Sequence, residues 1–383
     1  MGIQLELEQA EAVTKISEWY KKRSKKTFTL AGLAGTGKTT IIKYFMDKLN
    51  LHPDDTAFVA FTGKAALVLT SMGTPATTIH KLIYKVEEDK ATGDIFFTKA
   101  DRIPNTIKLI VVDEASMVSD DIQKDLESFN VPIIYLGDHG QLPPVQGVSK
   151  LMMNPDVKLE KIHRQAEGNP IIWLAKLARL GAKIPYKQYA PGVIKMSMKD
   201  VTPSLLTSVE QVLCGKNVTR NKLNMRIRAC LGKATPKVTV NDRVICLRNN
   251  WKKGYINGMT GVVTAITDFD KSHIDEKDSW RYHPEQKAMN LKPDYDMDEF
   301  EGGELHNIPF DMGVFTQQVP PDMKNICVEP FDYAYAITVH KAQGSQYVNG
   351  MVIEEYLGDS GIHKKWLYTA ITRFAQGLVL VGK

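Results

Sequence analysis

The sequence predicts an α/β protein in which helices cover parallel β-sheets, the doubly wound arrangement. Three observations carry this prediction: short apolar runs alternate with amphipathic segments, glycines follow several of the runs, and the alternation resumes near the end of the chain after an interruption. The chain has 383 residues, more than one hydrophobic core usually holds, so two or three domains are expected.

The first 165 residues alternate regularly between predicted helix and predicted strand. Residues 3–22 carry apolar side chains three and four positions apart, which predicts an amphipathic helix. The strand-like segments that follow are TFTLAG, TAFVAFTG, IKLIVVD and VPIIYLG, and KTTIIKYFMDKL and KAALVLTSM predict helices. Because parallel strands at this spacing are joined by crossover helices, residues 1–165 are expected to form one doubly wound domain.

The rest of the chain repeats this alternation around an interruption. NPIIWLAKLARLG and RNKLNMRIRACLG predict helices, and EQVLC, GMVIEEY and GLVLVGK predict strands. Residues 265–325 are rich in Asp, Pro, Gly and His and lose the rhythm, which indicates small-barrel or loop structure. We therefore expect a second α/β domain from residues 166–245 and 331–383, with residues 246–330 inserted as a β module.

Composition narrows the class of protein. The net charge of +5 permits a polyanionic partner without requiring one. The start, MGIQLELEQAEAV, is unlike a signal peptide, and no apolar run approaches the roughly 20 residues of a membrane span, so no membrane partner is expected.

The four cysteines form no CxxC pair and have no histidine at zinc spacing. This predicts reduced, buried thiols and a cytoplasmic protein, in the host cytoplasm if the source is viral.

A phosphate-binding loop is predicted between the first strand and its helix. GLAGTGKT, residues 32–39, fits the pattern G-x-x-x-x-G-K-[ST] in the strand-to-helix context in which that pattern binds phosphates. Its glycines let backbone N–H groups surround phosphate oxygens at the positive end of the helix. Lys38 would reach the β- and γ-phosphates, and Thr39 would ligate Mg²⁺. The residues expected to hold the nucleotide here are Gly32, Ala34, Gly35, Thr36, Gly37, Lys38, Thr39 and Thr40.

Two carboxylates follow a later strand. LIVVDEAS brings Asp113 and Glu114 to the carboxyl edge of the predicted sheet. Asp113 would hold the Mg²⁺ through its water shell, and Glu114 would orient and deprotonate an attacking water. A helix N-cap would explain such a carboxylate without chemistry. Together with the phosphate-binding loop, however, the pair predicts hydrolysis of a nucleoside triphosphate.

Gln141 follows the next strand, in IIYLGDHGQLPPV. That strand is expected beside the strand of Asp113, ending at the edge where open α/β sheets bind ligands. The amide would touch the γ-phosphate or the attacking water and report the loss of phosphate. Pro143 and Pro144 would stiffen the segment that follows. The plain alternative for Gln141 is a turn residue in a proline-rich loop.

The motifs, taken in order, resemble those of a known family. They are similar to the motifs of superfamily 1B, the 5′-to-3′ DNA helicases that include RecD and the phage helicase Dda, over about residues 9–375. In chain order they are Gln9, GLAGTGKT, AFTGKAA, TIHKL, VVDEAS, GDHGQLPPV, LEKIHRQ, TVHKAQGSQ and LYTAITR. The resemblance implies two RecA-like domains in tandem, ATP and Mg²⁺ as cofactors, and movement along single-stranded DNA.

The resemblance adds residues to the nucleotide site. Gln9 resembles the family's adenine-reading glutamine, and Gly344 would lie near the nucleotide. Arg164 and Arg373 resemble arginines that meet the γ-phosphate, where they would stabilise charge on the transferred phosphoryl group. A surface salt bridge is the alternative for either arginine. The expected catalytic residues are Lys38, Asp113, Glu114, Gln141, Arg164 and Arg373.

The resemblance also implies a DNA track over both domains. Hydroxyl, ammonium and backbone N–H groups in loops that follow strands suit contacts with phosphates. A buried structural histidine stays open as the alternative for His80 and His340. The residues expected at the DNA are Thr62, Gly63, Lys64, Thr78, His80, Arg220, Asn224, Thr338, His340, Lys341 and Ser345.

Two insertions resemble accessory parts of this family. Residues 83–103 contain two short strand-like runs around ATGD and resemble a β-hairpin pin that splits base pairs. Phe96 or Phe97 would meet DNA, because neighbouring residues on a strand face opposite sides, and core packing of both is the alternative. Residues 246–330 resemble a small SH3-like barrel that closes over DNA.

The motifs favour one function and leave rivals. The favoured function is an ATP-dependent DNA helicase that moves 5′ to 3′ on single-stranded DNA and acts at single/double-strand junctions. A translocase or remodeller with little unwinding shares every motif, whereas a nucleotide-gated DNA-binding scaffold without catalysis need not keep every catalytic group. A small-molecule kinase would need one α/β domain with a short lid. A monomer is expected, with a single-strand-binding protein and replication, recombination or repair proteins as candidate partners.

Overall fold

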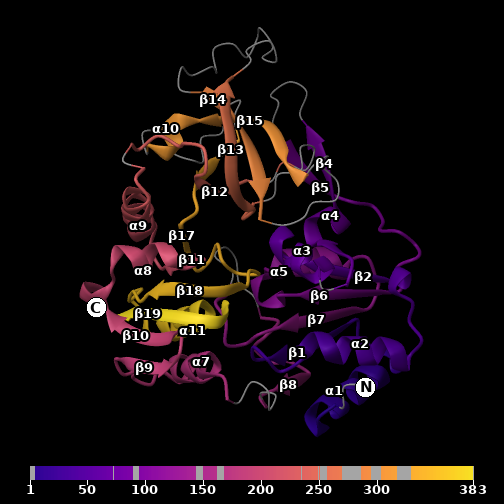
Figure 1. The fold of residues 1–383 in the computed structure, drawn as a ribbon. Helices are drawn as coiled ribbons and strands as arrows, with labels where there is room; N and C mark the ends of the chain where they lie inside the picture. The colour runs from indigo at the N-terminus through magenta and orange to yellow at the C-terminus, as the bar shows by residue number, and fades with distance from the viewer. Residues whose placement is uncertain are drawn as a thin grey trace. The chain divides into compact units, whose positions relative to one another are not determined.

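The computed structural model describes residues 5–71, 73–88, 95–143, 150–161, 168–233, 235–248, 250, 257–269, 286–294, 303–316 and 329–382. The chain forms two compact units, whose elements are labelled in Figure 1. The first comprises Met1–Pro185, Gln343–Ser345 and Leu357–Arg373, and the second comprises Tyr186–Ala342, Gln346–Tyr356 and Phe374–Lys383. Each unit is therefore assembled from several stretches of the chain.

The first unit contains a six-stranded parallel sheet in the order β3-β2-β6-β7-β1-β8. Its strands are β1 (Thr27–Gly32), β2 (Thr56–Ala60), β3 (Ala76–Thr78), β6 (Leu109–Asp113), β7 (Ile133–Gly137) and β8 (Val157–Leu159). Its helices are α1 (Leu7–Lys22), α2 (Lys38–Lys48), α3 (Gly63–Ser71), α4 (Ile79–Ile83), α5 (Asp120–Glu127), α7 (Pro170–Leu180) and α11 (Ser360–Ile371). This is the doubly wound sheet that the sequence predicts.

Strand β6 shows why the sheet is buried on both faces. Leu109 and Val111 pack in one core with side chains of α1 and α2. Ile110 and Val112 point the other way and pack in a second core with side chains of α4 and α5. Because side chains alternate along a strand, a continuous apolar run is what a sheet covered by helices on both faces requires.

The second unit contains another six-stranded sheet, in the order β17-β11-β18-β19-β10-β9. Its strands are β9 (Lys187–Ala190), β10 (Val193–Ser197), β11 (Gln211–Cys214), β17 (Ala336–Thr338), β18 (Tyr347–Ile353) and β19 (Phe374–Gly382), with helices α8 (Pro203–Ser208) and α9 (Asn217–Cys230). The pairings are parallel except that β9 runs antiparallel to β10. Leu206 of α8 and Leu223 and Ile227 of α9 pack against this sheet.

An antiparallel sheet of five strands completes the second unit, in the order β15-β14-β13-β12-β16. Its elements are β12 (Arg243–Cys246), β13 (Thr260–Asp268), β14 (Gln286–Pro293), β15 (Leu305–Asp311), α10 (Met312–Phe315) and β16 (Phe331–Tyr333). The sheet extends a few residues beyond the predicted bounds of 246 and 330, because β12 and β16 pair with each other through Val244 and Tyr333.

Strands β4 (Tyr84–Glu88) and β5 (Ile95–Lys99) form a separate antiparallel pair in the first unit. In its register Val86 pairs with Phe97 and Glu87 with Phe96. The side chains of Phe96 and Phe97 lie outside the described part of the structure. The remaining short elements are 3₁₀ turns at Pro53–Asp55, Ala115–Met117 and Met198–Asp200.

The division into units differs from the predicted boundary at residue 165. Helix α7 packs against α11, and both helices belong to the first unit although α11 connects two strands of the second unit's sheet. The sequence shows that these helices exist but gives no sign of which sheet they accompany. Among the described residues, no helix combines the length and apolarity needed to cross a bilayer.

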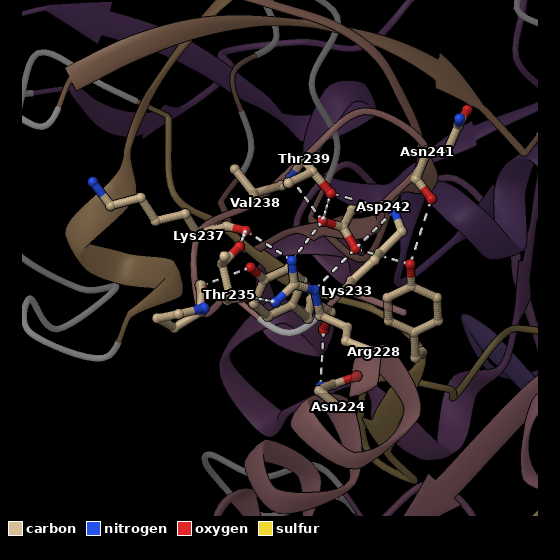
Figure 2. A network of polar contacts seen from close by, with 12 residues as sticks. Asn224, Arg228, Lys233, Thr235, Lys237, Val238, Thr239, Asn241 and Asp242 are labelled. Atoms are coloured by element: carbon tan, nitrogen blue, oxygen red, sulfur yellow. Dashed lines mark hydrogen bonds and ion pairs between the residues drawn. The ribbon is translucent and has the colours of Figure 1, made fainter. Parts of the chain in front are cut away.

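A buried ion pair ties α9 to the segment that enters the antiparallel sheet (Figure 2). Arg228 Nε and Nη2 each lie 3.0 Å from one carboxylate oxygen of Asp242, and Nη2 also donates to the carbonyl of Lys237 at 2.7 Å. Tyr335 donates to the same carboxylate at 2.9 Å. Burial acts to raise the pKa of Asp242, but bonds from Arg228, the Thr239 N–H and Tyr335 outweigh it and hold that pKa below its ordinary value.

The cysteines correct one expectation from composition. Cys214 and Cys246 are buried free thiols, as predicted, and burial raises the pKa of each to about 12. Cys230 is a free thiol too, but it is exposed at the end of α9. The prediction of buried thiols is therefore wrong for Cys230, because this position is the last residue of α9 and, unlike Leu223 and Ile227, is not part of the core cluster. Cys327 lies outside the described residues.

Candidate active site

The predicted phosphate-binding loop joins the end of β1 to the start of α2 in the first unit. Gly35 and Gly37 adopt φ angles of 79° and 78°, the left-handed region that favours glycine. A side chain at Gly32 would meet Thr36 Oγ1 at 2.4 Å. The loop therefore needs its glycines, and its N–H groups lie at the N-terminal end of a helix, where anions bind.

Lys38 holds this loop closed on itself. Its Nζ donates to the carbonyl of Gly32 at 2.7 Å and to that of Leu33 at 3.2 Å. Thr36 Oγ1 donates to the same Leu33 carbonyl at 2.8 Å. The ammonium group thus lies within the loop whose phosphate it is predicted to contact. The side chain of Thr39 lies outside the described part of the structure.

Gln9 connects α1 to the same loop. Its Nε2 donates to the carbonyl of Thr36 at 3.0 Å, and its Oε1 accepts from the N–H of Glu6 at 3.1 Å. The second bond is half of a capping box at the start of α1. The glutamine predicted to read adenine is therefore fixed beside the phosphate-binding loop.

Asp113 and Glu114 stand at the carboxyl end of β6. Asp113 Oδ1 accepts from the N–H of Glu114 at 2.8 Å. Glu114 adopts a φ of 50°, a strained conformation for a residue other than glycine. Burial raises the pKa of both carboxyls above their ordinary values. For Glu114 the Arg373 guanidinium opposes this rise, and the charge of Asp113 adds to it.

Gln141 lies between Glu114 and Arg373. In the amide orientation that satisfies both neighbours, its nitrogen donates to Glu114 Oε2 at 3.2 Å and its oxygen accepts from Arg373 Nη2 at 3.1 Å. Gln141 and Arg373 are each only 6% exposed. A turn residue facing solvent, the plain alternative, would not be buried between two charged groups.

Arg373, two residues beyond the end of α11, is held in place by that helix and by the segment at Ser345. Its Nε donates to the carbonyl of Thr369 at 3.2 Å, and its Nη1 donates to the carbonyl of Ser345 at 3.3 Å. Nη1 also lies 3.8 Å from Glu114 Oε1. The surface salt bridge considered for Arg373 is excluded by this burial. Arg164 lies outside the described residues.

Asp138 and Tyr368 lie in the same cluster, although no pattern in the sequence predicted a role for either residue. Tyr368 donates to Asp138 Oδ2 at 2.6 Å and accepts from the N–H of Ala34 at 3.0 Å. Both residues stand inside motifs that the sequence analysis quoted, GDHGQLPPV and LYTAITR. Their positions in those motifs could have marked them as candidate site residues. The sequence could not have predicted that they contact each other, because they lie in different motifs.

A pocket of about 280 Å³ opens beside the phosphate-binding loop in the first unit. Leu33 and Ala34 line it together with Tyr368 of α11 and with Trp173 and Arg179 of α7. Aromatic and cationic side chains thus surround a space next to the loop. Within the described part of the chain, no cluster of three or more His, Cys, Asp and Glu could hold a metal ion by itself.

Gly344 lies elsewhere than predicted. With a φ of 74°, it packs so closely on α3 that a side chain would meet Thr62 Oγ1 at 2.8 Å and Ala65 Cβ at 2.9 Å. Its neighbour Gln343 donates to the carbonyl of Leu142 at 3.3 Å. The structure therefore places Gly344 against the loop predicted for DNA, because only glycine permits this approach, and not against the phosphate-binding loop.

The DNA residues predicted in the first unit lie at the starts of two helices. Thr62 accepts from the N–H of Ala65 at 3.2 Å, Gly63 begins α3, and Lys64 is buried beside them. Thr78 caps α4. The His80 ring lies 6.1 Å from the Phe61 ring and 5.4 Å from the Tyr84 ring, and burial lowers its pKa. A packed, neutral histidine fits this environment, so the alternative that His80 is a buried structural histidine and not a DNA contact stays open.

Most of the remaining DNA predictions fall in the second unit. Thr338 ends β17 and is buried, and burial lowers the pKa of both His340 and Lys341. Lys341 donates to Asn257 at 2.8 Å, and Arg220 pairs with Asp332 at 2.6 Å. Ser345 belongs to the first unit and is buried.

Asn224, which the resemblance predicts to lie near DNA, is buried in the second unit. The side chain is 1% exposed. Its nitrogen donates to the carbonyls of Tyr333 and Ala336 at 3.3 and 3.0 Å, and its oxygen accepts from the N–H of Ala336 at 2.7 Å. All three bonds join Asn224 to backbone groups of β16 and β17. They give the side chain a structural role.

Comparisons with known proteins relate this chain to helicases. The family model described as an AAA domain matches residues 4–189, and that of a UvrD-like helicase C-terminal domain matches residues 333–381. The ATP-dependent RecD2 DNA helicase of Deinococcus radiodurans is 25% identical over 90% of this chain and 45% of its own length. The ATP-dependent DNA helicase Dda of Enterobacteria phage T4 is 32% identical over 33% of this chain and 30% of its own length. This chain thus spans less than half the length of either relative.

A solved structure shares the fold. It is described as the structural basis for DNA unwinding at forked double-stranded DNA by two coordinating Pif1 helicases. It covers 99% of this chain and 92% of its own, with 20% identity and a TM-score of 0.57. Together with the motif order, these likenesses show that the chain is similar in sequence to the RecD- and Dda-like helicases of superfamily 1B and shares its fold with a Pif1 helicase.

Proposed function

We propose that this chain is an ATP-dependent DNA helicase that translocates 5′ to 3′ along single-stranded DNA and separates duplex DNA. The observation that carries the proposal is Gln141 bonded between Glu114 and Arg373, beside Asp113 at the carboxyl edge of a sheet that also carries the phosphate-binding loop. A base, an amide and an arginine in mutual contact are the groups that hydrolysis of a phosphoanhydride requires.

The nucleotide would bind at the N-terminal end of α2. Lys38 would turn from the carbonyls of Gly32 and Leu33 to the β- and γ-phosphates, which offer it stronger, charge-assisted bonds. The pocket beside Leu33 and Ala34 has room and aromatic lining next to that loop. Gln9, whose side chain is bonded to the loop, would contact the base.

The carboxylates fit a magnesium ion. Asp113 and Glu114 offer the hard oxygen donors that Mg²⁺ prefers, and burial raises the pKa of both, an effect that a bound cation would oppose. Asp113 and Thr39 would hold the ion, which when bound neutralises charge on the β- and γ-phosphates.

Glu114 would act as the general base and Arg373 as the arginine finger. Glu114 would orient the attacking water and take its proton. Arg373, whose Nη1 lies 3.8 Å from Glu114 Oε1, would stabilise charge on the transferred phosphoryl group. Gln141 contacts both side chains, so departure of the γ-phosphate would change its hydrogen bonds and shift the loop that follows β7.

The rest of the fold suits translocation and strand separation. The two six-stranded sheets would be the cores of two RecA-like domains, residues 1–165 and 166–245 with 331–383. The β4–β5 pair, carrying Phe96 and Phe97, would be the pin, and the five-stranded antiparallel sheet the SH3-like module. Single-stranded DNA and its junctions with duplex would be the partners, contacted from the helix starts at Thr62 and Thr78 and from the segment at Lys341.

DNA-stimulated ATP hydrolysis tests the catalytic half of this proposal. Glu114→Gln keeps the size of the side chain but removes the base, so kcat should fall by about 10²-fold or more. Glu11→Gln makes the same chemical change on the exposed face of α1 and should leave kcat unchanged. A rate of ATP hydrolysis that does not rise when single-stranded DNA is added, or that is unchanged in Glu114→Gln, would favour a scaffold or another class of nucleotide-binding protein.

A further inference from the structure

We propose that Tyr368 is a positioning residue that couples the phosphate-binding loop to the loop carrying Gln141, which we call the sensor loop, residues 138–142. The proposal rests on the function proposed above and adds a residue to its machinery. It follows from a hydroxyl bridge, from the packing of the tyrosine ring, and from the way α11 holds the rest of the sensor loop.

The hydroxyl of Tyr368 joins the two loops directly. It accepts from the N–H of Ala34 in the phosphate-binding loop at 3.0 Å and donates to Asp138 Oδ2 at 2.6 Å. The other oxygen of Asp138 accepts from the N–H of Gly140 at 2.8 Å. One hydroxyl and one carboxylate therefore connect Ala34 to the backbone next to Gln141.

The ring of Tyr368 lies against Gly140. A Cβ built at Gly140 would meet Tyr368 Cε1 at 2.9 Å and Cδ1 at 3.2 Å. The φ of Gly140 is not positive, so the backbone conformation alone would tolerate a side chain. The closest contact is with the tyrosine ring, followed by Asp138 Oδ1 at 3.2 Å, so the glycine in GDHGQ makes room for both ends of the Tyr368–Asp138 bridge.

The same helix holds the rest of the sensor loop. The Thr369 hydroxyl accepts from the N–H of Leu142 at 3.0 Å, and Arg373 donates to Gln141 at 3.1 Å. These two contacts fix the loop on α11 and on the residue that follows its C-cap. Among the hydrogen bonds of the described residues, the Tyr368 hydroxyl is the one that continues from α11 to Ala34.

The chemistry of the bridge suits a permanent link. Burial, and then the negative charge of Asp138, raise the pKa of Tyr368, so the hydroxyl keeps its proton at neutral pH and remains a donor. Asp138 is 1% exposed, so without this donor one oxygen of a buried carboxylate would lose its partner. A displacement of the phosphate-binding loop at Ala34 would therefore be carried through Asp138 to Gln141.

Tyr368→Phe tests the bridge with the ring left in place. Amide hydrogen exchange should become at least several-fold faster at Gly140 and Leu142, because their acceptors depend on the anchored loop. The matched control is Tyr335→Phe, which removes another tyrosine-to-aspartate bond, 2.9 Å to Asp242 in the second unit, and should leave these amides unchanged. Equal exchange in both variants would overturn the proposal whether or not the chain hydrolyses ATP.

Kinetics then test whether the bridge positions Gln141. In Tyr368→Phe, kcat for DNA-stimulated ATP hydrolysis should fall about tenfold while KM for ATP stays within about twofold, because misplacement affects the reaction more than binding. Adding Gln141→Ala should then cost much less than it costs in the wild type, since the two residues act through one loop. Full additivity, or a wild-type kcat in Tyr368→Phe, would overturn the proposal. Absence of hydrolysis in the wild type would instead contradict the proposed function.

Gly140→Ala provides the second variant if Tyr368→Phe folds poorly. Its new Cβ would displace the ring and should reproduce both the faster exchange at Leu142 and the lower kcat. If Gly140→Ala shows neither effect while its melting temperature matches the wild type, the tyrosine ring does not hold the sensor loop and the proposal fails.

Discussion

Glu114 combines three features that suit a hydrolytic base. Its backbone is held at a φ of 50°, burial raises the pKa of its carboxyl, and its two oxygens face Gln141 and Arg373. Strain at an active-site residue persists only where the surroundings fix it, and here β6 and the N–H bond to Asp113 do so. The side chain is thereby aimed at the edge of the sheet where the phosphate-binding loop ends.

The raised pKa of Glu114 predicts the pH dependence of hydrolysis. A base must be deprotonated, so activity falls as pH decreases through its pKa, starting above the ordinary value of 4.5. Arg373 lowers this pKa, so Arg373→Gln should raise it further and move the acid limb of the kcat/KM profile to higher pH. Arg102→Gln removes an exposed arginine and should leave the limb in place. An acid limb that stays put or moves to lower pH in Arg373→Gln would contradict this assignment.

Gln141 gives a second prediction about single residues. Gln141→Ala removes the amide that contacts both Glu114 and Arg373, and kcat for ATP hydrolysis should fall by about 10²-fold, the effect of losing one preorganised polar group. Affinity for single-stranded DNA, measured without nucleotide, should not change. Gln188→Ala, at an exposed position of β9, serves as the control. A kcat within twofold of the wild type would contradict a catalytic role for Gln141 and favour the alternative that it is a turn residue.

Helix α9 shows how single elements are held in the second unit. Arg228, near its C-terminal end, is fully buried and pairs with Asp242, which lies directly before β12. The Arg228 guanidinium also lies 4.4 Å from the centre of the Tyr333 ring on β16. One side chain thus ties a helix packed on the parallel sheet to two strands of the antiparallel sheet (Figure 2).

Breaking this pair should destabilise the second unit. Asp242→Asn leaves the buried Arg228 charge uncompensated, which typically costs about 3–5 kcal/mol, so the urea midpoint should fall. The pKa of Asp242 is depressed, so its contribution is present at neutral pH and is lost as pH falls through the folded-state pKa. The difference in urea midpoint between the wild type and Asp242→Asn should therefore become smaller at acidic pH. Asp268→Asn, at an exposed pair with Lys287, should leave the midpoint unchanged. Equal midpoints for the two variants would show that the buried pair is not required.

Local patterns explain what could be predicted from the sequence. The phosphate-binding loop, the strand ending in Asp113 and the alternation of helix and strand depend on spacings of a few residues, and the structure contains all of them. The Tyr368–Asp138 bridge joins residues 230 positions apart, and no periodicity encodes such a pair. Cys230 was misjudged for a related reason: burial of a single side chain on a helix depends on what the other elements place against it.

At the scale of the whole molecule, the chain divides into two units that are each built from separate stretches of sequence. Arg373 and Gln343–Ser345 belong to the first unit, whereas the strands that flank them in sequence belong to the second. Residues of the last motifs are therefore part of the cluster around Glu114, and the chain passes from that cluster into the second unit's sheet within one or two residues. A change at the proposed γ-phosphate position would therefore act on residues directly connected to that sheet.

The central claim is tested most directly by strand separation, with ATP and Mg²⁺, on two matched duplexes, one carrying a 5′ single-stranded tail and the other a 3′ tail. We expect the wild type to open only the 5′-tailed duplex. Lys38→Ala should open neither duplex, and Lys48→Ala, at the exposed end of the same helix, should behave as the wild type. Opening of the 3′-tailed duplex would contradict the proposed direction, and with it the pin and SH3-like assignments. Failure of the wild type on both duplexes would contradict the helicase activity itself.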